Sequence, residues 1–245
     1  MEAELLQDKL EDKSLWYKYK TEVWSKNTPQ TATVHNIMRV LRSIRNSGDF
    51  AYVSVAITSG KYLYEQSILH PELSKKDLLN SAISHNYNQG WNLIKDLKER
   101  RQVPVLYPAD MVPIRQDWEQ AHFQALWLSI IAEKCTEMHM SSGWEFSNGG
   151  SEEFTHVMQL RLGIPKHPQL IFYNTKESES SERKRMKNIK VYDCQGKPIS
   201  LEDGIKSIEI SSAWVKDKGF EPKRLNNCLE LLYWSKCMIE KGFYQ

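Results

Sequence analysis

The sequence predicts an α/β protein with a doubly wound parallel five-stranded sheet and helical N- and C-terminal extensions. Residues 50–57 form an unbroken apolar stretch, which is typical of a central strand buried on both faces. Further short apolar stretches follow, and segments with apolar residues at helical spacing separate most of them. Strands that alternate with helices favour a parallel sheet, whose ligands bind beyond the carboxyl ends of the strands.

The N-terminal segment is expected to be helical. Residues 3–24 and 30–46 carry apolar residues at helical spacing. The apolar face of the second helix consists of Val34, Ile37, Met38, Leu41 and Ile44. Asn46, Ser47 and Gly48 end this helix. Residues 1–48 are therefore predicted to form an extension that precedes an α/β domain at residues 49–200.

The first strand runs directly into Thr58-Ser59-Gly60, as expected of a strand that feeds a functional loop. After this loop, Ser74 and Asp77 form a capping box that starts a helix. An interruption of that helix is expected near Gly90, because glycine weakens a helix interior. This part of the chain is predicted to supply the first loop of a ligand site.

The second strand is expected at residues 103–108 and the third at residues 135–140. Between them, Asp117 and Gln120 form a capping box that opens a helix with apolar residues at i, i+3, i+4 and i+7. Because the strands are predicted to be parallel, their loops should converge at one edge of the sheet. The loops concerned begin after Ile57, Pro108 and Met140.

The fourth and fifth strands are expected at residues 169–173 and 189–192, with a polar, solvated loop at 174–188 between them. Ser200 and Asp203 form a capping box that opens a C-terminal extension at residues 201–245. Its apolar and aromatic side chains fit packing on the sheet, on a second copy of the chain or on a protein partner. The terminal helices therefore leave a homo-oligomer and a protein partner both open.

Composition indicates a globular protein without a metal or cofactor. Of the 245 residues, 40% are apolar, and the net charge of +2 is too small to indicate a polyanion, so nucleic acid binding is unsupported. The four cysteines lack metal-ligand spacing, and no nucleotide-binding glycine motif or serine-hydrolase elbow occurs. The acidic start and the lack of a long apolar run predict a cytoplasmic protein without a membrane span.

The segment 143–153 places a carboxylate directly after a loop of small residues. The loop follows the third strand, and a helical pattern follows the loop, so Glu153 is expected in the first turn of a helix. Backbone N–H groups at a helix start bind anions, and the helix dipole favours an ionised carboxylate there. An ionised Glu153 is a candidate nucleophile and a poor general acid.

The alternative interpretation of this segment is structural. Ser151 can be the N-cap of the helix, with Glu152 and Glu153 only complementing its dipole. Of the two carboxylates, Glu153 lies four residues before Val157 and so near the apolar stripe, whereas Glu152 points roughly the opposite way. If the segment is a site, Glu153 is therefore the predicted catalytic residue.

Three elements together resemble the nucleoside 2-deoxyribosyltransferase-like superfamily. They are Tyr52-Val53-Ser54 with Ile57-Thr58 after it, the strand that ends in Tyr107-Pro108, and Gly-Trp-Glu-x-Ser-x-Gly-x-x-x-Glu at 143–153. The resemblance covers roughly residues 49–173. It implies a flavodoxin-like sheet and cleavage or transfer of the N-glycosidic bond of a nucleoside or nucleotide. The glutamate that attacks the anomeric carbon in this family falls on Glu153.

The resemblance also implies the other substrate contacts. Tyr52 falls near the base or sugar, with Ser54 beside it, and the residues around phosphate or sugar are Ser147, Asn148 and Gly149. The leaving base needs a proton or hydrogen bonds, for which Asp110 is the first candidate and His85 and Asn86 are alternatives. Trp144 is a candidate for stacking on the base.

Two functions of different class remain open. The first is a nucleoside or nucleotide N-glycosidase or deoxyribosyltransferase, and proteins that resemble this family include nucleotide-depleting effectors in bacterial defence. The second is a catalytically inactive nucleotide-binding sensor or interaction module. Glu153 favours the first function. Val55 and Thr136 stand where many relatives have glycine and aspartate, which favours the second.

Overall fold

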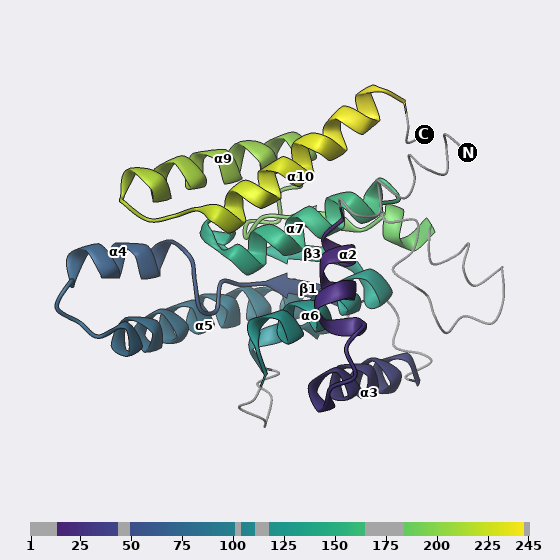
Figure 1. The fold of residues 1–245 in the computed structure, drawn as a ribbon, viewed down its shortest axis with the longest axis horizontal. Helices are drawn as coiled ribbons and strands as arrows, with labels where there is room; N and C mark the ends of the chain where they lie inside the picture. The colour runs from purple at the N-terminus through teal and green to yellow at the C-terminus, as the bar shows by residue number, and fades with distance from the viewer. Residues whose placement is uncertain (1–13, 44–49, 101–103, 111–117, 165–183, 243–245) are drawn as a thin grey trace.

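The computed structural model describes residues 14–43, 50–100, 104–110, 118–164 and 184–242. It is an α/β structure with a parallel sheet of four strands in the order β2-β1-β3-β4 (Figure 1). The strands are β1 Phe50–Ser54, β2 Val105–Leu106, β3 Cys135–Met140 and β4 Lys190–Tyr192. The prediction of a parallel sheet with helices is therefore confirmed.

Strand β4, at residues 190–192, is the strand that was expected to be the fifth. It pairs with β3 on the side away from β1. The expected fourth strand, at residues 169–173, lies outside the described residues. β1 ends at Ser54, earlier than its apolar stretch. Val55 and Ile57 leave the strand but still pack on the apolar cluster beside α5, so the apolar pattern overestimated the length of the strand.

Alternating side chains of β1 enter two different cores. Val53 packs against α5 (Lys75–Arg100), together with Leu93 and Leu97. Tyr52 faces the other side, in the larger core that includes α6 (Gln120–Lys134) and α7 (Asn148–Arg161). The sheet is thus covered on both faces, as a parallel sheet requires.

Helix α5 runs without a break through Gly90, where an interruption was expected. A Cβ at this position would collide with the ring of Tyr107, whose hydroxyl donates to the carbonyl of Tyr87 at 3.2 Å. Gly90 therefore allows the loop after β2 to lie close to the helix. Before α5, helix α4 (Lys61–Leu69) follows the β1 loop, and the two helices form a projecting hairpin (Figure 1).

The capping boxes predict some helix starts and miss others. Ser74 with Asp77 starts α5, and Ser200 with Asp203 starts α9 (Leu201–Asp217), as expected. Helix α6 begins after Glu119, which forms a capping box with His122, and Asp117 lies outside the described residues. The N-cap of α7 is Ser147, so the alternative that assigned this role to Ser151 is wrong.

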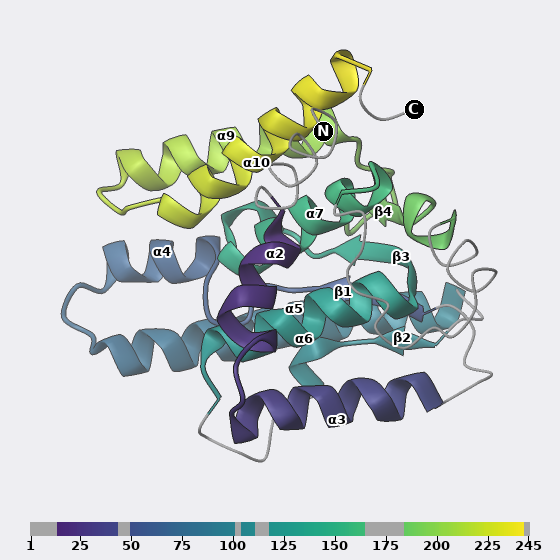
Figure 2. The same cartoon turned by 45° about the vertical axis from the view of Figure 1, so that its right-hand side comes forward.

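The terminal helices pack on the α/β core. Helix α2 (Leu15–Tyr19) continues into a π-helical turn, η1 (Lys20–Trp24), and crosses α6 and α7 (Figure 2). Helix α3 (Pro29–Ser43) packs on α6. Helices α9 and α10 (Lys223–Glu240) pack together and cover α7 on the side away from the strands (Figures 1 and 2). No helix within the described ranges is long and apolar enough to cross a membrane.

Candidate functional site

The carboxyl ends of the two central strands, β1 and β3, lie side by side at one edge of the sheet. The N–H of Ser141 donates to the carbonyl of Ser54 at 2.9 Å, where both strands end. The loops beyond them meet again at Ser59 and Ser147, whose hydroxyl oxygens are 3.1 Å apart. The expected convergence is therefore confirmed for the loops after β1 and β3, which are parallel neighbours.

Glu153 projects from α7 onto the end of β1. The hydroxyl of Tyr52 donates to its Oε1 at 2.7 Å, and the hydroxyl of Ser54 donates to its Oε2 at 2.5 Å. Two residues apart on a strand, Tyr52 and Ser54 face the same side of the sheet. Glu153 is 5% exposed and both hydroxyl residues are fully buried. Three residues of the predicted site thus form one buried cluster.

The protonation of Glu153 differs from the expectation. Burial raises its pKa from 4.5 to about 7, although the hydrogen bonds from Ser54 and Tyr52 act in the opposite direction. Helix α7 begins at Asn148, so Glu153 lies in the second turn rather than the first, and the helix dipole has weakened there. The prediction of a firmly ionised carboxylate was therefore wrong. A group with this pKa accepts and donates protons near neutral pH.

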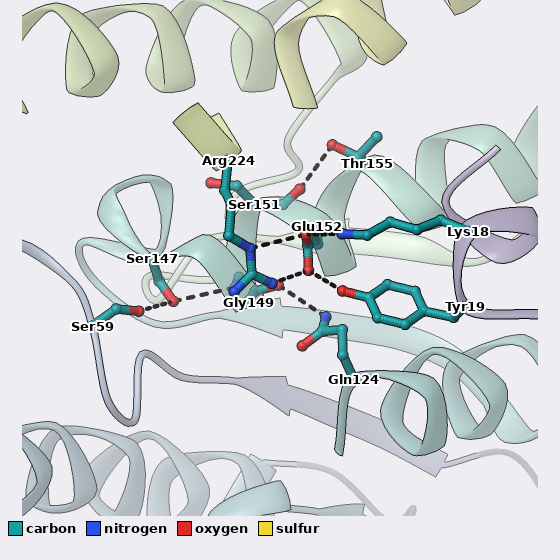
Figure 3. Close-up of polar contacts among 11 residues, drawn as sticks. Lys18, Tyr19, Ser59, Gln124, Ser147, Gly149, Ser151, Glu152, Thr155 and Arg224 are labelled. Atoms are coloured by element: carbon teal, nitrogen blue, oxygen red, sulfur yellow. Dashed lines mark hydrogen bonds and ion pairs between the residues drawn. The ribbon is translucent and has the colours of Figure 1, made fainter. Parts of the chain in front are cut away.

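The first turn of α7 holds the residues that the resemblance assigns to phosphate. The hydroxyl of Ser147 accepts from the N–H of Gly150 at 3.2 Å, and Gln124 donates to the carbonyl of Gly149 at 3.4 Å (Figure 3). Asn148 and Gly149 are half-exposed. First-turn N–H groups of a helix bind anions, and here those of Asn148 and Gly149 are the ones that the Ser147 hydroxyl does not occupy.

Two further residues lie at the β1 loop: Asn86, which the sequence suggested as a donor to the leaving base, and Lys61, which was not identified from the sequence. The buried side chain of Asn86 donates to the carbonyls of Ile57 at 3.3 Å and Ser59 at 3.1 Å, so Asn86 braces the loop. Lys61 follows Gly60, and its ammonium lies 5.7 Å from the centre of the Phe146 ring. A cation directly after the loop of the first strand is a signal that could have identified Lys61 in the sequence.

Asp110 lies on the β2 side of this edge, on the short helix η2 (Pro108–Asp110). It is exposed and accepts a hydrogen bond from the Tyr87 hydroxyl at 3.1 Å. His85, which is half-buried, stacks on Tyr62 with ring centres 3.9 Å apart. These contacts tie Asp110 and His85 to α5 and α4 rather than to Glu153.

Trp144, on the short helix η3 (Trp144–Phe146), contributes mainly to the core. Its ring packs on that of Phe154 at 4.8 Å between centres, and 5% of the residue is exposed. It also borders a hollow of about 440 Å³ between the β3 loop and α9, together with Lys197 and Lys206. The expected stacking of Trp144 on a base at Glu153 finds no support in this packing.

Glu152 points away from the sheet, as its helical position predicts, but it is not a solvated surface residue. It is 2% exposed and accepts hydrogen bonds from Tyr19 at 2.8 Å and from Arg224 Nε at 3.2 Å (Figure 3). Lys18 adds an ion pair at 3.4 Å. The terminal helices α2 and α10 supply these partners, which gives Glu152 a structural environment.

No group of three His, Cys, Asp or Glu side chains in the described part of the chain could hold a metal ion. Cys135 and Cys228 are buried, and burial raises the pKa of each thiol to about 12, which makes both poor nucleophiles. The reactive side chain among the clustered residues at this edge is Glu153, with the hydroxyl groups of Tyr52 and Ser54 around it. Comparisons with models of known families, with characterised proteins and with solved structures find no match to this chain.

Proposed function

We propose that this protein cleaves or transfers the N-glycosidic bond of a nucleoside or nucleotide, with Glu153 as the nucleophile. One observation carries the proposal: a buried glutamate, held on both oxygens by Tyr52 and Ser54, lies at the carboxyl ends of the central strands. Ligands of open parallel sheets bind at this edge. Tyr52, Ser54 and Glu153 also belong to the motifs that resemble the nucleoside 2-deoxyribosyltransferase-like superfamily.

The ionised form of Glu153 would attack the anomeric carbon of the sugar. The bond from that carbon to the base nitrogen breaks, its electron pair leaves with the base, and the base takes up a proton. The transition state resembles an oxocarbenium ion, which a nearby carboxylate stabilises. Water or a second base then releases the sugar from Glu153. The two hydroxyl donors fix the orientation of the carboxylate for the attack.

A nucleotide is the substrate class that the start of α7 favours. Ser147, Asn148 and Gly149 surround first-turn N–H groups, and Lys61 adds a cation at the neighbouring loop. Asp110 remains the proposed proton source for the leaving base. It would have to act from the β2 loop, on the same edge of the sheet.

The sheet order is compatible with the flavodoxin-like fold that the resemblance implies. The order β2-β1-β3-β4 corresponds to the first four strands of the flavodoxin-like arrangement. We propose this fold for the α/β domain, and a cytoplasmic, nucleotide-depleting role in bacterial defence for the whole protein. Neither a metal nor a cofactor has a part in this proposal.

The alternative, a nucleotide-binding sensor without turnover, is favoured by the burial of Glu153. With 5% exposure and a pKa raised to about 7, this carboxylate is only partly ionised at neutral pH. A sensor would use the same edge of the sheet to bind a nucleotide. The two functions therefore differ in turnover and share a ligand.

Base release separates the two functions. Wild-type protein and Glu153→Gln are incubated with a panel of nucleosides, 5′-nucleotides and NAD, and free base is measured by chromatography. Release by the wild type alone supports the enzyme, whereas binding without release supports the sensor. If no compound is bound and no base is released, both functions are contradicted.

Calorimetry on the same panel tests the phosphate site. A 5′-monophosphate should bind more tightly than its nucleoside by roughly 1.5–3 kcal/mol, which is the contribution of one charge-assisted hydrogen bond. Gly149→Glu should remove the difference, and a Cβ at this position meets only ordinary contacts, so the variant is expected to fold. Equal affinity for both ligands in the wild type would contradict the anion site.

A further inference from the structure

The carboxylate of Glu152 joins three segments that are far apart in the sequence. Arg224 of α10 binds it through Nε and Nη2, the Tyr19 hydroxyl of α2 donates to Oε2, and Lys18 lies 3.4 Å from Oε1 (Figure 3). The Glu152 side chain is 3% exposed, against 31% for Arg224 and 39% for Lys18. A buried carboxylate thus receives two cations that reach it from the surface.

The same two helices hold α7 at further points. The N–H of Leu15 donates to Gln159 Oε1 at 3.1 Å, and the ring of Trp16 stacks on that of His156 with centres 6.5 Å apart. On the other side, α10 buries an apolar row in the core shared with α7, consisting of Leu225, Cys228 and Leu232. The side of α7 opposite the sheet is therefore fixed by both ends of the chain.

Glu152 and Glu153 are adjacent in the sequence, and one faces the terminal helices while the other faces β1. Burying a carboxylate without a counter-ion costs several kcal/mol, so two neighbouring buried carboxylates need compensation. Tyr52 and Ser54 supply Glu153 with neutral donors, and the cations bind Glu152 instead. The charge of Glu152 is among the causes that raise the pKa of Glu153.

We propose that Arg224 and Lys18 are positioning residues for Glu153: they clamp and neutralise Glu152, and so fix the orientation and the local charge of the turn that carries the nucleophile. The inference rests on the proposed role of Glu153. It assigns the terminal helices a part in the chemistry of the site, in addition to any part in binding a partner.

Other titratable groups around this pair of carboxylates bear on the prediction. On the sheet side they are Tyr52 of β1 and Cys135 of β3; on the helix side they are Tyr19, Glu22, Lys18, Arg224 and Cys228. Helix α6 contributes the neutral amide of Gln124. Burial raises the pKa of Tyr19, of Tyr52 and of both thiols, so these groups stay neutral up to alkaline pH. The cations in this set are Lys18 and Arg224.

The test is a carbon NMR titration of the full-length protein labelled at the glutamate carboxyl carbon. The Glu153 signal is assigned by its loss in Glu153→Gln. Arg224→Met should raise the pKa of Glu153 by at least about half a unit, because it leaves the charge of Glu152 less compensated. Glu152→Gln should lower the pKa of Glu153 by a similar amount, since it removes a negative charge and leaves two cations.

The opposite directions distinguish this inference from a purely structural role, because loosened packing would move both variants the same way. Arg224→Lys keeps the charge, so the pKa of Glu153 in this variant should lie close to the wild-type value. Lys223→Met is the matched control, since it removes one charge from the exposed neighbour of Arg224 on α10. Shifts in the same direction, or none in either variant, would overturn the inference.

The titration needs no turnover, so it separates this inference from the proposed function. If the wild type releases base, the midpoint of its pH–rate profile should move in the same directions as the NMR values. If the wild type releases base but the variants show no pKa shift at Glu153, only the positioning role is contradicted. If the variants show the shifts but the wild type releases no base, the electrostatic coupling is supported and the proposed chemistry is contradicted.

Discussion

The two sides of α7 place neighbouring glutamates in opposite surroundings. Glu153 faces the sheet and meets two hydroxyl groups, whereas Glu152 faces the terminal helices and meets two cations and one hydroxyl. Both are nearly inaccessible to solvent. The difference shows that burial alone does not decide the role of a carboxylate. Neutral donors orient Glu153 without supplying a counter-charge, whereas cations hold Glu152 in an ion pair.

The largest expected difference between the two sides is in catalysis. Glu153→Gln should reduce base release by at least about 1000-fold, because the amide is not a nucleophile. Glu152→Gln should reduce the activity of the folded protein by less than about tenfold, because its carboxylate does not touch the substrate. The measurement is the initial rate of base release, normalised to the folded fraction from circular dichroism. Equal losses would remove the distinction between the two carboxylates.

The second prediction concerns stability against pH. The pKa of Glu153 is raised from 4.5 to about 7 in the folded protein. Between these values the unfolded chain loses a proton that the folded protein keeps, so the contribution of Glu153 is fully present below pH 4.5 and is lost as pH rises through about 7. The loss is on the order of 3 kcal/mol.

Urea unfolding of the wild type and Glu153→Gln at several pH values measures this contribution. As the pH rises through about 7, the free energy of unfolding of the wild type should fall more than that of Glu153→Gln. A difference that stays constant across this range would show that Glu153 keeps an ordinary pKa.

The third prediction concerns the cations on the other side of the helix. Arg224→Met should lower the free energy of unfolding by about 2 kcal/mol, because it leaves the buried Glu152 with fewer partners. Lys223→Met, on the exposed side of the same helix, should change it by less than about 0.5 kcal/mol. Thermal and urea unfolding at neutral pH compare the two. An equally small effect in both would show that the Arg224 pair contributes nothing to stability.

The smallest effects come from removing one hydroxyl on each side. Tyr52→Phe should reduce base release by about fivefold, since one hydrogen bond that orients Glu153 contributes ~1 kcal/mol. Tyr19→Phe should change the rate by less than about twofold, because Arg224 and Lys18 still hold Glu152. Both changes remove one phenolic oxygen, so the ratio of the two rates is the measurement. A larger loss in Tyr19→Phe would reverse the proposed roles.

Local sequence patterns predicted the parts of the molecule that depend on near neighbours. The apolar stretch gave β1, and the pairs Ser74–Asp77 and Ser200–Asp203 gave two helix starts. The helical position of Glu153 relative to the apolar stripe also placed its side chain correctly, toward the sheet.

Contacts between distant segments explain what the sequence did not show. Lys18 lies 134 residues from Glu152 and Arg224 lies 72 residues from it, so no local pattern reveals that they meet. The pKa of Glu153 was misjudged for the same reason, because the dipole argument is local whereas its burial comes from the whole core. Gly90 likewise looked like a helix break because its partner, Tyr107, belongs to the β2 loop.

Trapping the covalent intermediate identifies the nucleophile. A nucleoside substrate that carries fluorine at the sugar carbon next to the anomeric centre destabilises the oxocarbenium-like transition state and slows release of the sugar from the enzyme. Intact-protein and peptide mass spectrometry then identify the modified residue. We expect a sugar adduct on Glu153 that is absent in Glu153→Gln and retained in Glu152→Gln. Base release with an adduct on another residue, or with none under conditions that slow the second step, would contradict this expectation.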